Sequence, residues 1–151
     1  MMIHTGGFVT GGGWIDSPIG AAVDYPTAVG KANFGFNAKF QKGSNIPTGN
    51  TEFQFKAGNL NFKSTSYEWL VVQGKTKAQF KGTGTINGSG SYTFMLTAFD
   101  GDNQGNKKPD SFRIKITGPG GIVYDNKMNQ PDTSDEATEL GGGSIVIHDG
   151  K

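Results

Sequence analysis

Residues 32–40 read ANFGFNAKF, and the spacing of their apolar side chains indicates the fold class. These side chains occupy every second position, at Phe34, Phe36, Ala38 and Phe40. Successive side chains of a β-strand point to opposite faces of a sheet, whereas a helix repeats every three to four residues. The stretch therefore predicts a strand with one buried face.

The same period of two recurs along most of the chain, for example in residues 51–55, 92–98 and 111–116. It shifts by one position after Gly58, which predicts a β-bulge or a tight turn there. Asn87-Gly88 separates two such runs and predicts a hairpin, because both residues of this dipeptide accept a positive φ. We expect an all-β fold, an antiparallel β-sandwich of roughly eight to ten strands with Ig-like or jelly-roll connections.

A chain of 151 residues is long enough for one domain with a core of its own. We expect residues 1–8 to form a flexible N-terminal arm and residues 9–151 to form a single β-sandwich domain. The polar, acidic tract at 125–143 predicts a long excursion before the last strand, with a short helical turn at 133–140.

Composition excludes several classes of function. The net charge is +1 and Arg113 is the only arginine, so there is no concentrated basic face for nucleic acid. Cysteine is absent, which excludes disulfides, zinc–thiolate sites and thiol catalysis. No apolar run has the length of a membrane span, and residues 1–13 lack the pattern of a signal peptide. We expect no membrane insertion, and an exported form would be a processed chain or an excised domain.

Four stretches resemble a family of bacterial extracellular β-domains. They are GGGWIDSPIGA (11–21), GKANFGFNAKFQKGSNIPTGNTEFQF (30–55), YEWLVV (67–72) and GSIVIH (143–148). Members of that family lie at the C-terminal end of large surface or secreted proteins, after choice-of-anchor, PKD-like or Ig-like repeats. The resemblance covers roughly residues 9–148 and implies a location outside the cell and a modular context, but no chemistry. The start MMIHTGG and the tract at 125–142 depart from the family pattern.

The stretch FDGDNQGNKKPD at 99–110 has the spacing of a calcium-binding loop. Asp100, Asp102 and Gln104 occupy its first, third and fifth positions, and Asp110 follows. Calcium is bound by six to eight oxygens, often from alternate loop residues before a glycine. We predict Ca²⁺ as a cofactor with these four ligands. The alternative is a polar turn in which the carboxylates accept hydrogen bonds from backbone amides.

Aromatic residues offer a second type of site. Tyr67, Trp69 and Tyr92 lie in strand patterns and are expected in the core, and residues 69–72 predict a strand covered on both sides. Trp14, in the glycine-rich GGGWIDSP stretch, is the expected ligand-binding aromatic, because an exposed indole gives a sugar ring apolar contact area.

Nothing in the sequence predicts an enzyme. His4 and His148 lie near the two ends of the chain, outside any zinc-binding spacing, and no nucleophile or nucleotide motif is present. Glu52 and Glu68 are a conceivable glycosidase pair, but each is more simply a surface residue of a strand. An isopeptide crosslink from Lys31 or Lys39 to Asn126, with Glu68 beside it, is a further alternative.

Three functions remain open on these grounds. The first is a non-catalytic structural or adhesive module of a bacterial surface or secreted protein, stabilised by Ca²⁺ and in contact with other domains or subunits. The second is a carbohydrate-binding module that binds polysaccharide through Trp14. The third is a self-assembling subunit whose Gly-rich arm at 1–13 pairs with a neighbouring sheet.

Overall fold

Antiparallel strands make up most of the computed structural model, which describes residues 7–40, 46–101 and 109–148. The ten strands of these residues are β1 (Phe8–Ser17), β2 (Gly30–Phe40), β3 (Pro47–Phe55), β4 (Leu60–Gln73), β5 (Lys77–Ile86), β6 (Ser89–Phe99), β7 (Ser111–Gly118), β8 (Gly121–Asp125), β9 (Thr138–Glu139) and β10 (Gly142–His148). A 3-10 turn, η1 (Lys56–Gly58), joins β3 to β4. The expected all-β, antiparallel fold is confirmed.

The strands form one sheet in the order β10-β1-β2-β3-β4-β5-β6-β7-β8, with β9 also paired to β7. Tight turns join β3 to β4 and β5 to β6, whereas residues 18–29 join β1 to β2. Asn87 and Gly88 have φ values of 53° and 81° between β5 and β6, and Asn59 has φ 51° after η1. Both turns lie where the sequence predicts them. The result is a meander, which is simpler than Ig-like or jelly-roll connections because each of the first seven strands pairs with the next one along the chain.

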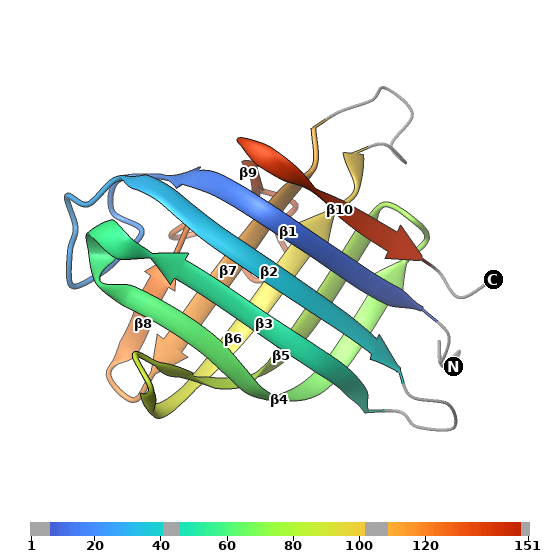
Figure 1. Ribbon diagram of the computed structural model, residues 1–151, viewed down its shortest axis with the longest axis horizontal. Coiled ribbons are helices and arrows are strands. Elements are labelled where there is room, and N and C mark those ends of the chain that lie inside the picture. Colours follow the sequence, from blue (N-terminus) through green and yellow to red (C-terminus); the bar gives the residue numbers. More distant parts are fainter. Residues whose placement is uncertain (1–6, 41–45, 102–108, 149–151) are drawn as a thin grey trace.

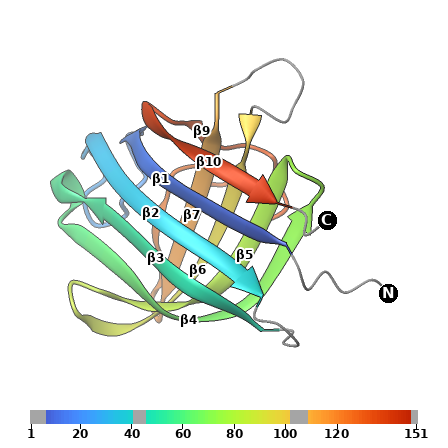
Figure 2. The same ribbon diagram turned by 45° about the vertical axis from the view of Figure 1, so that its right-hand side comes forward.

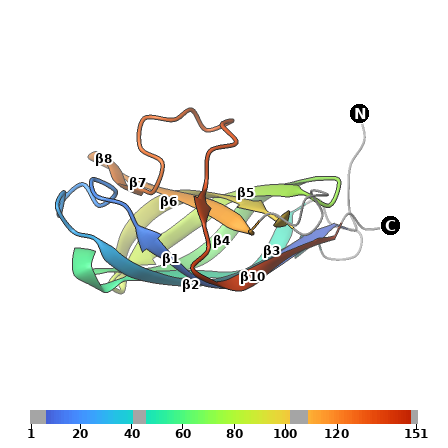
Figure 3. The same ribbon diagram turned by 90° about the horizontal axis from the view of Figure 1, so that it is seen from above.

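The sheet folds over on itself and so forms two layers. Figure 1 shows β10, β1, β2 and β3 in front of β5, β6, β7 and β8, and Figure 3 shows the two layers from above. The bend lies in β4, a strand of 14 residues. Its pairing with β5 is irregular between Ser64 and Ser66 and again between Tyr67 and Trp69. Irregularities of this kind bend a strand and increase its twist, so β4 belongs to both layers.

Phenylalanine side chains fill the space between the layers, as the alternation predicts. Phe34 of β2 stacks on Phe112 of β7 across that space, with ring centroids 4.2 Å apart. Tyr67 is also buried there, and its hydroxyl donates a hydrogen bond of 2.7 Å to the carbonyl oxygen of Asn37. Burial raises the pKa of the Tyr67 phenol to about 12. A continuous aromatic core therefore holds the front layer to the rear layer.

The two outer edges of the sheet are covered in the described residues. On the β10 edge, the amide of Ile145 donates to Asp110 Oδ2 (2.6 Å) and the amide of Ile147 donates to Asp100 Oδ2 (3.2 Å). On the β8 edge, residues 21–23 exchange backbone hydrogen bonds with Val123 and Asp125. Unpaired strand edges are sites of association between chains, and these two edges are occupied.

Two expectations about segments are altered by the structure. β1 begins at Phe8, and residues 11–13 lie inside the sheet between β10 and β2, as Figure 2 shows. Residues 8–13 of the proposed assembly arm are therefore already paired, and residues 1–6 lie outside the described residues. The short helical turn at 133–140 is wrong, because Thr138 and Glu139 pair with β7 instead. In the described part of the chain, no helix has the length and apolarity that a membrane span requires.

Candidate functional site

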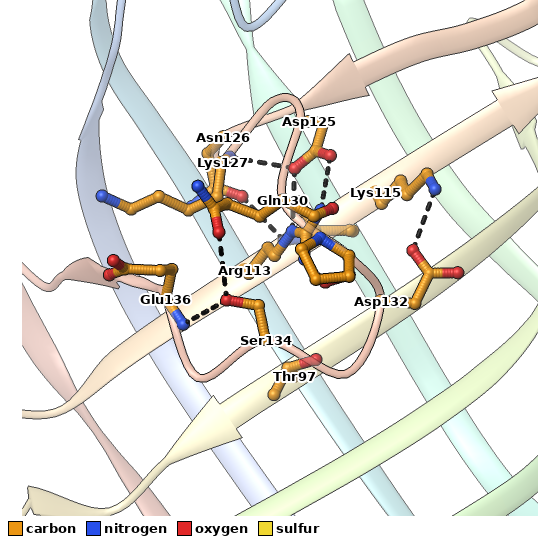
Figure 4. Close-up of polar contacts among 12 residues, drawn as sticks. Thr97, Arg113, Lys115, Asp125, Asn126, Lys127, Gln130, Asp132, Ser134 and Glu136 are labelled. Atoms are coloured by element: carbon orange, nitrogen blue, oxygen red, sulfur yellow. Dashed lines mark hydrogen bonds and ion pairs between the residues drawn. The ribbon is translucent and has the colours of Figure 1, made fainter.

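Residues 126–137, the crossing segment, run over the outer face of the rear layer and are held there by Arg113. Alternation along β7 places Arg113 on this outer face, yet it is only 1% exposed. Its guanidinium donates two hydrogen bonds to the carboxylate of Asp125, of 3.0 Å and 2.7 Å. It donates two more to the carbonyl oxygens of Gln130 (2.9 Å) and Pro131 (2.8 Å). Figure 4 shows this cluster, which fixes the middle of the crossing segment above β7.

Asn126 fixes the start of the crossing segment. Its side-chain oxygen accepts a hydrogen bond from the amide of Ile114 (2.8 Å), and its nitrogen donates to the carbonyl oxygen of Phe112 (2.9 Å). The same nitrogen donates to the hydroxyl of Thr138 (2.8 Å) at the far end of the segment. The Asn126 side chain thus makes the hydrogen bonds to the backbone of β7 that a strand would make between β8 and β9.

The residues of the isopeptide alternative are not brought together. Asn126 is buried against β7 in the rear layer, whereas Lys31 and Lys39 are exposed on the outer face of β2. Glu68 is exposed on β4. That crosslink is therefore excluded by the positions of its members.

Further polar contacts join the crossing segment to β5 and β7. Lys115 forms an ion pair of 2.9 Å with Asp132, and the side-chain amide of Gln79 donates to the carbonyl oxygen of Asp132 (2.8 Å). Lys77 pairs with Asp135 at 2.6 Å. These contacts hold residues 132–135 over the sheet as a wall.

Between this wall and Trp69 lies a groove of about 480 Å³. Its floor contains Lys81 of β5, the cross-strand neighbour of Trp69, and Met95 of β6, the cross-strand neighbour of Lys81. Hydroxyl and amide side chains surround the floor, from Gln79, Thr93, Thr117 and Thr133. We call this the outer groove. Its volume falls in the range of ligand-binding pockets in proteins.

Trp69 is half-buried and lines the outer groove, so the expectation that it lies in the core is wrong. The irregular pairing at Tyr67 and Trp69 shifts the alternation by one residue. Leu70 and Val72 point inward as a result, whereas Trp69 and Val71 point outward, and Val71 is 46% exposed. The strand at 69–72 is therefore covered on one side only. Tyr67 is buried as expected, and Tyr92 is partly buried.

The front layer carries a second, shallower depression on its outer face, of about 390 Å³. Its lining includes Asn33, Glu52, Gln54 and Lys63, all of which are exposed. Glu52 and Lys63 form a loose ion pair of 3.7 Å. These side chains are exposed, whereas the side chains of β4–β7 that line the outer groove are half-buried or buried, so the depression is less enclosed than the outer groove.

Trp14, the aromatic predicted to bind ligand, lies on the front layer next to Asn33, one of the residues that line this depression. Its cross-strand neighbours are Asn33 and Gly142. The indole packs so closely on Gly141 that an added Cβ would lie 2.1 Å from the ring, and the ammonium of Lys31 lies 4.4 Å from the ring centroid. The ring is thus partly covered by its own chain, whereas Trp69 lies beside the polar groups of the outer groove.

The predicted calcium loop is described only at its two ends. Asp102 and Gln104 lie outside the described residues. Asp110 accepts hydrogen bonds on both carboxylate oxygens, from the amides of Gly101 (2.7 Å) and Ile145. Asp100 is buried and accepts from Ile147. Both carboxylates thus cap backbone amides, as the polar-turn alternative requires, and calcium binding stays a prediction.

No catalytic cluster is evident among the described residues. They contain no group of three acidic, histidine or cysteine side chains placed to hold a metal. His148 packs edge-on against Phe8, and His4 lies outside the described residues. Neither a protein-family model, a curated protein nor a solved structure matches this chain. Function is therefore inferred from the chemistry of the site itself.

Proposed function

We propose that this protein is a non-catalytic, adhesive carbohydrate-binding module of an extracellular bacterial surface or secreted protein, and that sugar binds in the outer groove. The observation that carries the proposal is the half-buried Trp69, which lines the groove together with the hydroxyl and amide groups of Thr93, Thr117 and Gln79. A pyranose has an apolar face of C–H groups and a rim of hydroxyls. An indole packs against the apolar face, and polar side chains form hydrogen bonds with the hydroxyl groups.

Rigidity supports this function. Trp69 and the floor of the groove lie on paired strands, and the opposite wall is fixed by the buried Arg113–Asp125 ion pair. A ligand that enters a preformed groove orders few protein groups, so little of its binding energy is lost to conformational entropy.

The lining of the groove supports binding without catalysis. Asp132 is the one carboxylate among the described lining residues, and it is paired with Lys115. Hydrolysis of a glycosidic bond normally uses two carboxyl groups on either side of that bond. The setting outside a bacterial cell is supported by the family resemblance of the 11–21, 30–55 and 143–148 stretches.

The test compares the two tryptophans, which lie on opposite layers. Soluble polysaccharides are screened by affinity electrophoresis with the full chain, and the best ligand is measured by calorimetry with Trp69→Ala and Trp14→Ala. We expect Trp69→Ala to weaken binding by roughly 10- to 100-fold, the usual cost of losing a central aromatic contact. Trp14→Ala is the matched control and should bind like the parent.

Two results contradict the proposal. Loss of binding in Trp14→Ala alone would move the site to the front layer. Absence of binding to every polysaccharide of a broad panel, by protein that is folded by circular dichroism, would remove the carbohydrate function.

A further inference from the structure

Charge pairing on the outer face of the rear layer is uneven. Four cationic side chains point outward from β5 and β7, namely Lys77, Lys81, Arg113 and Lys115. Three of them pair with carboxylates of residues 125–135, as described above. Lys81 forms no ion pair with any described residue. Among the described cations that β5 and β7 carry on this face, the acidic tract thus neutralises all but Lys81, which lies in the floor of the outer groove.

Lys81 lies where a ligand on Trp69 would reach it. In the cross-strand row it stands between Trp69 of β4 and Met95 of β6. Side chains directly opposite on neighbouring strands have Cβ atoms about 5 Å apart. A ring stacked on the indole therefore brings its substituents to the ammonium group.

Burial strengthens the effect of this charge. Lys81 is half-buried between its neighbours, whereas Lys63 of the front layer is 61% exposed and has Glu52 beside it. A charge that is partly withdrawn from solvent is screened less by salt, and its side chain has less freedom to lose on binding. The nearest carboxylate of the wall, Asp132, is already occupied by Lys115.

We propose that the outer groove is specific for acidic polysaccharides, and that Lys81 binds the carboxylate of a uronic acid residue stacked on Trp69. This inference rests on the proposed function, since it names the class of sugar that the groove selects. A lysine ammonium donates up to three hydrogen bonds and has no acceptor, so it favours a carboxylate over a neutral hydroxyl.

The test uses sugars that differ in charge alone. The full chain is titrated with polygalacturonate and alginate, and with the methyl ester of each, which keeps the backbone and removes the charge. We expect at least one acidic polymer to bind roughly tenfold more tightly than its ester, and this preference to shrink as ionic strength rises.

Variants assign the preference to one side chain. Lys81→Gln should lower affinity for the acidic polymer to that for its ester and leave binding of the ester unchanged. Lys39→Gln is the matched control, because it makes the same change in net charge on the exposed outer face of β2. Equal effects of Lys81→Gln and Lys39→Gln would overturn the proposal, since the attraction would then be diffuse.

Other outcomes separate this inference from the proposed function. Binding of neutral polysaccharides only, lost in Trp69→Ala, would overturn the acidic specificity and leave the carbohydrate function intact. Binding of poly-glutamate as tightly as polyuronate through Lys81, with Trp69→Ala unaffected, would overturn both, because the groove would then recognise charge without sugar. Binding of no polysaccharide at all would also overturn both.

Discussion

Arg113 shows how a single side chain acts on the whole outer face. Its position on β7 follows from the alternation of Phe112, Ile114 and Ile116, and alternation alone predicts that it meets solvent. The acidic tract at 125–143 covers it instead, and Asp125 meets it 12 residues along the chain. A buried guanidinium needs a carboxylate and further acceptors, and the described structure gives it both.

Removal of the Arg113 side chain should therefore be costly. Arg113→Met leaves the buried carboxylate of Asp125 without its cation, and we expect the free energy of unfolding to fall by roughly 3–5 kcal/mol. Lys115→Met is the matched control, because its pair with Asp132 is partly exposed and should contribute less than about 1 kcal/mol. Urea denaturation of both variants measures the difference. Equal losses would mean that Arg113 does not anchor the crossing segment.

Trp69 marks the limit of prediction at the residue scale. Periodicity correctly places the phenylalanines of β2, β3 and β7 in the core, because their strands keep strict alternation. It fails at Trp69, where an irregularity in the pairing of β4 with β5 reverses the alternation. Such an irregularity depends on the bend of the whole sheet, which a local pattern does not contain. The outer groove was missed for the same reason.

At the scale of elements, the turns could be predicted from the sequence, but the contacts that cover the edges of the sheet could not. Gly58 and Asn87-Gly88 are local signals, and each forms the turn that its residues favour. β9 has two residues, and the side chain of Asn126 replaces a strand beside it. Neither has a repeat that a sequence pattern could reveal. The closing contacts of β10 depend similarly on Asp100 and Asp110, which the sequence suggests as metal ligands.

Asp110 provides a test of this closure. Asp110→Ala removes the acceptor of the Gly101 and Ile145 amides, and hydrogen bonds to a charged group contribute about 1.5–3 kcal/mol each. We expect a loss of stability of roughly 3 kcal/mol and faster hydrogen exchange at Ile145, measured by NMR. Asp24→Ala, in an exposed loop, is the control and should leave exchange unchanged. Unchanged exchange in Asp110→Ala would show that β10 is held by β1 alone.

At the scale of the whole molecule, the period of two predicts a layered all-β fold, but it leaves the order of the strands open. Strand pairing depends on which edges meet, and the same alternation suits a meander, an Ig-like sandwich or a jelly roll. Here each of β1–β7 pairs with its successor, and β4 carries the sheet from one layer to the other. The two layers are thus parts of one sheet around one aromatic core.

A shared core implies that the two layers unfold together, and the two tryptophans report on them separately. Trp14 lies on the front layer, and Trp69 lies where β4 pairs with β5 of the rear layer.

Trp69→Phe leaves Trp14 as the sole indole, and Trp14→Phe leaves Trp69 as the sole indole. Each variant is unfolded in urea and followed by fluorescence and by circular dichroism. We expect the two signals to coincide within each variant, because Phe34 and Phe112 cannot leave their stack without exposing both layers. A fluorescence midpoint below that of circular dichroism in either variant would instead show that one layer separates first, and the folded sheet would then consist of two units joined only through β4.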